Sequence, residues 1–171
     1  MKVTAVLQQD NLQLSQQVGD MLRANNWTIC TAESCTGGLI ASTLTDLAGS
    51  STYVMGGIVT YSNEAKMRMV NVKATTLQEH GAVSESTAHE MAVGVRDVFD
   101  TDYALSVTGI AGPGGGTPTK PVGLTFVGLA RRDGLVIVQQ HIWDADRMTN
   151  KQHSVHAALT LLLDTMKSME I

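Results

Sequence analysis

One stretch constrains the fold more than any other. It is an apolar run at residues 27–30, followed by a turn of hydroxyl residues and two glycines at residues 31–38 (TAESCTGG), and by a helix-compatible segment from Leu39. This order predicts a strand that turns directly into a helix. The first N–H groups of a helix lack intrahelical partners, so an anion or a developing oxyanion is favoured there. From these residues alone, a capped structural turn and a ligand-binding turn are equally well supported.

Helix-like and strand-like segments alternate through the first two thirds of the chain. Helical spacing predicts helices at residues 10–25, 39–47, 63–70, 75–80, 84–99 and 146–169, and apolar runs predict strands at 27–31, 56–61, 103–108, 122–130 and 135–143. The last two strands are joined by Asp133-Gly134, which indicates a hairpin. We therefore predict a single α/β domain over residues 1–171, with a mixed β-sheet and helices on both faces. Residues 1–9 fit no element and are expected to be poorly ordered.

Composition excludes several classes of protein. The chain is 43% hydrophobic and 16% charged with a formal net charge of −4, which argues against a nucleic-acid-binding or anionic-membrane surface. No apolar run is long enough to span a bilayer, and no secretory signal pattern is present. With only two cysteines and no metal-binding motif, we expect a cytoplasmic protein without metal or cofactor. Low charge and abundant Met and Val favour a homo-oligomer, for which a dimer is expected.

Two strand-end motifs carry groups suited to acyl chemistry. The first offers Ser34 and Cys35 as alternative nucleophiles, with backbone amides of the turn (Cys35, Thr36, Gly37 and Gly38) as oxyanion donors. It is not the G-x-S-x-G elbow, because Ala32 takes the first glycine position. The second motif carries Tyr61 and Lys66, which suit acid–base work, and a Ser–Lys pair is an alternative to Ser–His. Taken alone, Lys66 on a solvated helix surface is the simpler interpretation.

Two later features suit the binding of an anion. The glycine-rich loop at residues 109–116 lacks the P-loop and dinucleotide signatures, but its backbone can curl around a phosphate; the glycines in question are Gly109, Gly112, Gly114 and Gly115. A structural crossover loop explains them equally well. Arg147 and Lys151 open the last helix, where cations oppose the helix dipole and therefore point to an anionic ligand. Lys120 is expected to add to the same pocket.

Taken together, the motifs resemble one known family. They stand in one order at residues 32–38, 49–51, 59–66, 80–84, 109–113 and 120–123. In this order they are similar to the C-terminal domain family of the competence/damage-inducible protein CinA, whose stand-alone members are nicotinamide-nucleotide amidases. The resemblance runs from about Leu14 to the last helix.

The resemblance implies hydrolysis of the carboxamide of nicotinamide mononucleotide (NMN), in recycling of pyridine nucleotides. It implies Ser34 as the nucleophile, Tyr61 and Lys66 as acid–base partners, and the glycine-rich loop with Arg147 as ligand-binding elements. The family's late G-D-R motif reads Ala145-Asp146-Arg147 here, and a following Arg is Lys151. Because Lys lacks the bidentate fork of Arg, a non-catalytic nucleotide-binding or regulatory module is the alternative.

Overall fold

The computed structural model describes residues 2–168, which form a mixed sheet in the strand order β2-β1-β3-β4-β5. Strand β1 (Ile29–Glu33) lies in the middle of a parallel trio, between β2 (Val54–Val59) and β3 (Tyr103–Gly109). Strands β4 (Leu124–Arg131) and β5 (Val136–Ile142) continue the sheet as an antiparallel hairpin, as the Asp133-Gly134 turn predicts.

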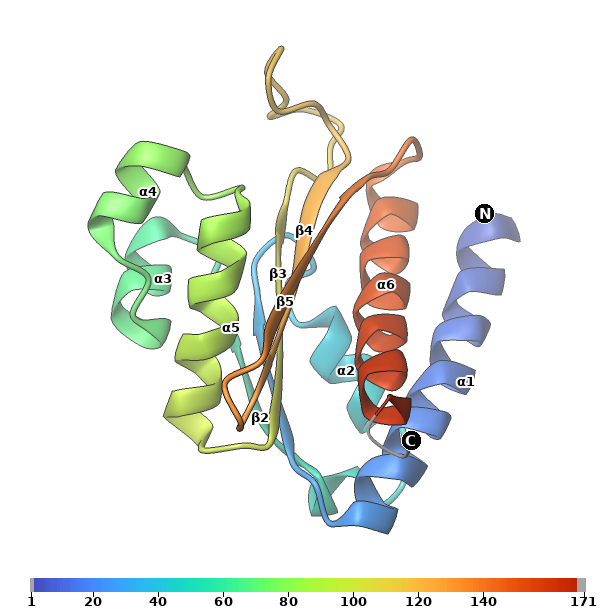
Figure 1. Cartoon of the computed structure of the whole chain (residues 1–171). Helices are drawn as coiled ribbons and strands as arrows, with labels where there is room; N and C mark the ends of the chain where they lie inside the picture. The colour runs from blue at the N-terminus through green and yellow to red at the C-terminus, as the bar shows by residue number, and fades with distance from the viewer. Residues whose placement is uncertain (1, 169–171) are drawn as a thin grey trace.

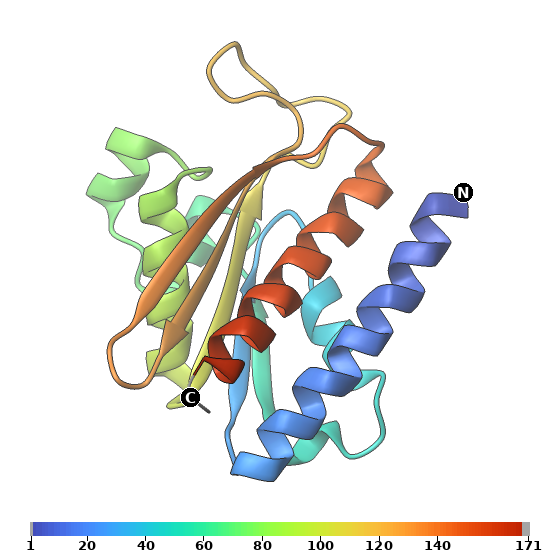
Figure 2. The same cartoon turned by 45° about the vertical axis from the view of Figure 1, so that its right-hand side comes forward.

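Helices cover both faces of this sheet (Figures 1 and 2). On one face lie α1 (Lys2–Asn25), α2 (Leu39–Thr45) and α6 (Arg147–Lys167). On the other lie α3 (Asn63–Val70), α4 (Ala74–His80) and α5 (Glu85–Phe99), and a 3-10 turn (Ser50–Thr52) precedes β2. The predicted α/β class, with a mixed sheet between two helical layers, is confirmed.

The central strands are buried on both faces because each face packs against helices. Toward α1 and α6, Leu105 and Leu129 of the sheet pack with Leu159 and Leu162 in the larger apolar cluster. Toward α5, small side chains of the same strands meet Met91 and Val95; these small side chains are Cys30, Ala104 and Ala130. The alternation of β1, β3 and β4 between these clusters fixes their register, since a shift by one residue would exchange the two faces.

Helix α1 begins at Lys2, eight residues before the expected start at Asp10. In its first turns Val3 and Val6 are 63% and 58% exposed, so these two apolar side chains are not part of the core. Polar contacts to α6 hold this part instead, with Thr4 Oγ1 2.7 Å from Thr149 Oγ1. Further along, the Asn11 amide donates to the carbonyl and side-chain oxygens of Gln152. The expected end of the last helix at Met169 lies outside the described residues.

Strand β1 is displaced by two residues from the predicted 27–31 and ends at Glu33. An acidic residue rarely ends a fully buried strand, and the reason that Glu33 does so is given below. In α5, Ser84 is the N-cap, and its hydroxyl accepts the N–H of Thr87 at 3.2 Å. The carboxyl ends of β1, β2 and β3 meet at one end of the sheet, where ligands of parallel α/β proteins usually bind.

Candidate active site

A cavity of about 290 Å³ opens at this end of the sheet. Its walls come from five separate parts of the chain: the turn after β1, the end of β2 with α3, the connection between α4 and α5, the end of β3 with its glycine-rich loop, and the start of α6. Predicted residues from both strand-end motifs and from both anion-binding features line it: Ser34, Cys35, Tyr61, Lys66, Gly109, Gly112, Gly114, Gly115 and Arg147.

Ser34 and Lys66 contact each other directly in this cavity. The Lys66 Nζ atom lies 3.0 Å from Ser34 Oγ and 2.7 Å from the Thr60 carbonyl oxygen. Helix α3 holds the lysine there, because the Ser62 hydroxyl caps that helix by accepting the Ala65 N–H at 3.0 Å. Lys66 is 1% exposed, so the interpretation as a solvated surface lysine is wrong.

Burial gives Lys66 the chemistry of a base. Its pKa is lowered from the ordinary value, because burial penalises the charged ammonium, and the nearby Cys35 only partly opposes this. Within residues 2–168 no carboxylate forms an ion pair with Lys66. The neutral amine that accepts a proton is therefore more readily populated than in a solvated lysine.

Cys35, the alternative nucleophile, is in a poorer state to react. Burial raises the pKa of its thiol to about 11, with a further upward contribution from the Glu33 charge. The side chain is 8% exposed. A thiol needs to be a thiolate to attack, so this environment favours Ser34 over Cys35.

The amides of the turn divide into two pairs. The Gly37 N–H donates to the Ser34 carbonyl at 3.1 Å, and the Gly38 N–H donates to the Glu33 carboxylate at 3.1 Å. In the described part of the chain, the amides of Cys35 and Thr36 donate to no backbone carbonyl, although the Cys35 amide contacts its own thiol sulfur. Of the four amides expected as oxyanion donors, those of Gly37 and Gly38 therefore already have a carbonyl or carboxylate acceptor, whereas those of Cys35 and Thr36 do not.

Arg147 joins the glycine-rich loop to the mouth of the cavity. Its guanidinium donates to the Gly112 carbonyl at 2.8 Å and to the Tyr61 hydroxyl at 3.3 Å. Tyr61 is 62% exposed, and its hydroxyl is bonded to Arg147 rather than to Ser34 or Lys66. The arrangement places a cation and a phenol at the rim, where a substrate would enter.

The two other basic residues lie away from the cavity lining. Lys151 does not line the cavity, although a Cβ built on Gly37 would be 3.9 Å from its Nζ atom. Lys120 donates to the carbonyls of His80 and Val83, at 2.5 and 2.8 Å, and so ties the loop to the α4–α5 connection. The expectation that Lys120 adds a cation to this pocket is wrong, because backbone carbonyls hold its ammonium elsewhere.

Sequence reasoning missed several residues that shape the site. Thr60 supplies the carbonyl that holds Lys66. Thr108 donates to the Ala82 carbonyl at 2.6 Å and so joins the end of β3 to the α4–α5 connection, and Thr108 and Ala82 both line the cavity. A contact through a backbone carbonyl does not depend on the type of side chain, so it produces no recognisable sequence motif. Glu33, by contrast, could have been identified from the sequence, because an acidic residue at the end of a buried apolar strand is unusual.

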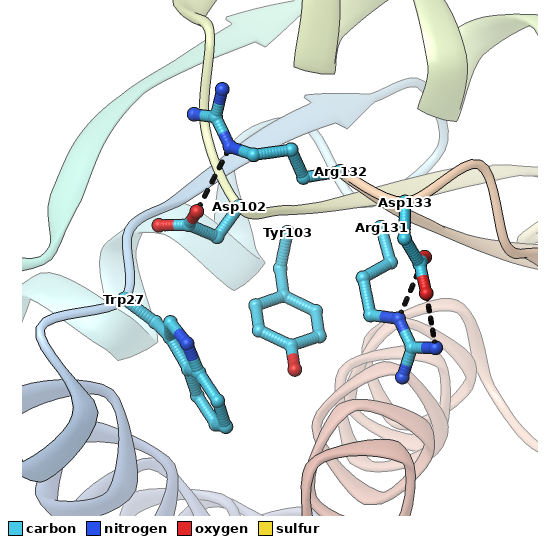
Figure 3. Close-up of a pocket in the computed structure, with 6 residues that line it drawn as sticks. All are labelled: Trp27, Asp102, Tyr103, Arg131, Arg132 and Asp133. Carbon is cyan, nitrogen blue, oxygen red and sulfur yellow. Dashed lines mark hydrogen bonds and ion pairs between the residues drawn. The ribbon is translucent and has the colours of Figure 1, made fainter. Parts of the chain in front are cut away.

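A second hollow of about 140 Å³ lies at the opposite end of the sheet (Figure 3). The Trp27 and Tyr103 rings meet edge to face there, with centroids 5.4 Å apart. Both arginines beside them are already paired: Arg131 with Asp133, and Arg132 with Asp102 and Asp100. Compensated guanidinium groups make this hollow a poorer phosphate site than the cavity at Ser34.

Residues 2–168 contain no group of three or more His, Cys, Asp or Glu side chains placed to hold a metal ion. None of the helices there is both long enough and apolar enough to cross a bilayer.

Comparison with known proteins assigns the family. The model described as "CinA C-terminal domain" matches residues 11–166. This chain belongs to the CinA C-terminal domain family. A CinA-like protein of Chloroherpeton thalassium is 47% identical over 161 residues, which cover 92% of this chain and 38% of that protein. The chain therefore spans little more than a third of the length of such CinA-like relatives.

Shorter members of the CinA C-terminal domain family match along their whole length. Nicotinamide-nucleotide amidohydrolase PncC of Enterobacter agglomerans is 45% identical over 157 residues, covering 91% of this chain and 96% of that protein. Among solved structures, the competence/damage inducible protein CihA from Agrobacterium tumefaciens superposes with a TM-score of 0.89 at 42% identity, over 91% of this chain and 94% of that one. The resemblance found in the motifs is confirmed.

Proposed function

We propose that this protein hydrolyses the carboxamide of NMN to nicotinic acid mononucleotide and ammonia. The observation that carries the proposal is the buried Lys66 Nζ, 3.0 Å from Ser34 Oγ, in an open cavity. The likeness to nicotinamide-nucleotide amidohydrolase PncC supports this substrate class.

The first step is acylation of Ser34. Neutral Lys66 accepts the hydroxyl proton while Ser34 Oγ attacks the carboxamide carbon and forms the C–O bond. When the tetrahedral intermediate collapses, the C–N bond breaks, and the proton on Lys66 passes to the departing nitrogen to give ammonia. Water then attacks the ester with Lys66 again as the base, which frees the acid and restores Ser34.

The oxyanion of each tetrahedral intermediate needs donors that are not otherwise occupied. The amides of Cys35 and Thr36 donate to no backbone carbonyl, and they follow Ser34 directly in the chain. At the rim, Arg147 and the glycine-rich loop would hold the 5′-phosphate, where Arg provides a fork of donors. Tyr61 would contact the bound nucleotide beside Arg147, and Lys151 would contribute charge from outside the cavity lining.

The direct test is ammonia release from NMN, with product identity checked by mass spectrometry. Ser34→Ala is expected to lose about 10³-fold or more in kcat, and Cys35→Ala to stay within about threefold of wild type. Loss in Cys35→Ala with Ser34→Ala intact would transfer the nucleophile to Cys35. Nicotinamide riboside, which lacks the phosphate, is expected to react with a much higher KM.

Binding of NMN by calorimetry without any product after long incubation would overturn the proposal in favour of a non-catalytic nucleotide-binding module. The altered late motif does not by itself favour that alternative. Asp146 still caps α6 by accepting the Thr149 N–H at 2.9 Å, and Arg147 still lines the cavity.

A further inference from the structure

We propose that Glu33 is a positioning residue for the Ser34–Lys66 pair, a role that rests on the proposed amide hydrolysis. Its carboxylate holds the turn that carries Ser34, and it keeps the Gly38 amide away from the oxyanion site. Glu33 immediately precedes Ser34 and is 1% exposed.

The carboxylate of Glu33 is held by four donors. One oxygen accepts the N–H groups of Gly38 and Ile40, at 3.1 and 3.0 Å. The other accepts the Ala41 N–H at 2.8 Å and the Thr31 hydroxyl at 3.3 Å. None of the ion pairs among residues 2–168 includes Glu33, so its charge is compensated by the amides and dipole at the start of α2.

This capping spans the whole turn. The N-cap residue of α2 is Gly38, which has no side chain to cap the helix. The cap comes instead from the end of β1, five to eight residues upstream of the amides it accepts. The turn from Ser34 to Gly37 therefore begins directly after the Glu33 backbone at the end of β1. Its other end, at Gly38, is held by the Glu33 carboxylate.

The backbone of Glu33 connects to the lysine as well. Its carbonyl accepts the Thr60 N–H at 2.7 Å, and the Thr60 carbonyl in turn accepts Lys66 Nζ at 2.7 Å. Glu33 is thus linked to three parts of the site. It is joined to Ser34 by a peptide bond, it binds the start of α2 through its side chain, and it contacts Lys66 indirectly through Thr60. A small displacement at Glu33 would change the distance between Oγ and Nζ, on which proton transfer depends.

Glutamine cannot reproduce this arrangement, although it has the same shape. Its amide offers one oxygen, and its NH₂ group would face N–H or O–H donors that need an acceptor. A buried donor left without an acceptor drives local rearrangement. The Glu33→Gln change should therefore release one side of the turn while leaving the hydrophobic core intact.

The first experiment separates kcat from KM for NMN in Glu33→Gln. We expect kcat to fall about tenfold or more while KM changes less than about threefold, because the phosphate grip at Arg147 is on other elements. Glu90→Gln is the matched control. The Glu90 carboxylate accepts the Lys73 N–H and the Thr76 hydroxyl, both at 2.8 Å, at the start of α4, although, unlike Glu33, it also pairs with a cation, the Lys73 ammonium, at 3.6 Å. Its kcat should stay within about twofold of wild type.

A second readout needs no substrate. Cys35 lies next to Ser34 in the same turn, so its rate of alkylation by iodoacetamide, followed by peptide mass spectrometry, reports the turn's geometry and charge. We expect Glu33→Gln to speed alkylation of Cys35 about fivefold or more and Glu90→Gln to leave it unchanged. Cys30, which is fully buried, serves as the internal reference for global loosening.

Wild-type kcat and wild-type Cys35 alkylation in Glu33→Gln would overturn the role of Glu33. Equal acceleration at Cys30 and Cys35 would also overturn it, since that pattern reports general destabilisation. If wild type fails to hydrolyse NMN, the proposed function fails, and the two alkylation rates alone decide on Glu33. Should Glu33→Gln not fold, Thr31→Val removes one of the four donors, and a smaller acceleration at Cys35 alone is expected.

Discussion

Lys66 Nζ lies 3.0 Å from Ser34 Oγ, although the two residues come from different strand–helix units of the sheet. The contact depends on the parallel pairing of β1 with β2, in which Glu33 is opposite Val59. Because the nucleophile and the base each follow the end of one of these strands, the pairing itself brings them together. No flexible segment has to close to form the pair.

The pH dependence of activity should follow the ionisation of Lys66. The base must be neutral, and burial lowers its pKa below the ordinary value of 10.5. We therefore expect kcat for NMN to rise with pH through the lowered pKa and to level off below pH 10.5. Steady-state rates between pH 6 and 10 measure this, and a rate that falls across the range would contradict Lys66 as the base.

The free energy of unfolding should also depend on pH through the ionisation of Lys66. Since the folded-state pKa of Lys66 is lower than the unfolded one, the unfolded chain binds more protons between the two values, and stability rises with pH there. Wild type should therefore gain stability relative to Lys66→Met as pH rises toward 10.5. Urea unfolding at pH 7, 8.5 and 9.5 measures the difference.

Lys73→Met is the control for that series, because Lys73 is 74% exposed and its side chain lies outside the cavity. Its stability relative to wild type should vary much less over the same pH range. A parallel trend in both variants would mean that the pH effect does not come from Lys66.

Arg147 and Lys151 should differ in their effect on substrate binding. Arg147 lines the cavity and Lys151 does not, so Arg147→Met should raise KM for NMN about tenfold or more and Lys151→Met much less. With nicotinamide riboside, which has no phosphate, Arg147→Met should change KM little. Equal losses with both substrates would argue that Arg147 acts on the chemistry instead of the phosphate.

Gly94 allows a close approach between α5 and the end of α3. A Cβ built there would lie only 1.8 Å from the Val70 carbonyl oxygen. Replacing an exposed helical glycine with alanine usually stabilises a protein by about 1 kcal/mol, but here we expect Gly94→Ala to destabilise by about 3 kcal/mol or more. Thermal unfolding measures this, with His89→Ala on the exposed face of α5 as the control. A stabilised Gly94→Ala would show that the two helices can separate without cost.

The sequence predicts those parts of the structure that depend on local pattern. The helix over Glu85–Phe99 and the hairpin at Asp133-Gly134 have strong periodicity or turn chemistry, and both are confirmed. The first turns of α1 were not predicted because their contacts to α6 are polar and long-range, as between Thr4 and Thr149. The local sequence pattern of a helix does not show which polar residue of a distant helix it will contact.

The same distinction holds for the site. Motifs identify side chains with suitable chemistry, such as Lys66 and Arg147, but Lys66 taken alone is more simply interpreted as a solvated surface lysine, whereas it is buried. That lysine is buried because its Nζ atom donates to the carbonyl of Thr60, the residue that follows β2. The division of the turn amides likewise depends on Glu33, whose role becomes visible only when α2 is placed next to β1.

The nucleophile with its base and the anion-binding residues of the cavity come from different elements of the fold. Ser34, Lys66 and their supports belong to β1, β2 and the helices that follow them, whereas the glycine-rich loop and Arg147 belong to the β3–β4 connection and α6. A change of loop length or sequence at residues 110–121 would therefore leave the Ser–Lys pair in place. Loop exchange at these residues is accordingly a way to change which ligand the cavity accepts while the Ser–Lys pair stays intact.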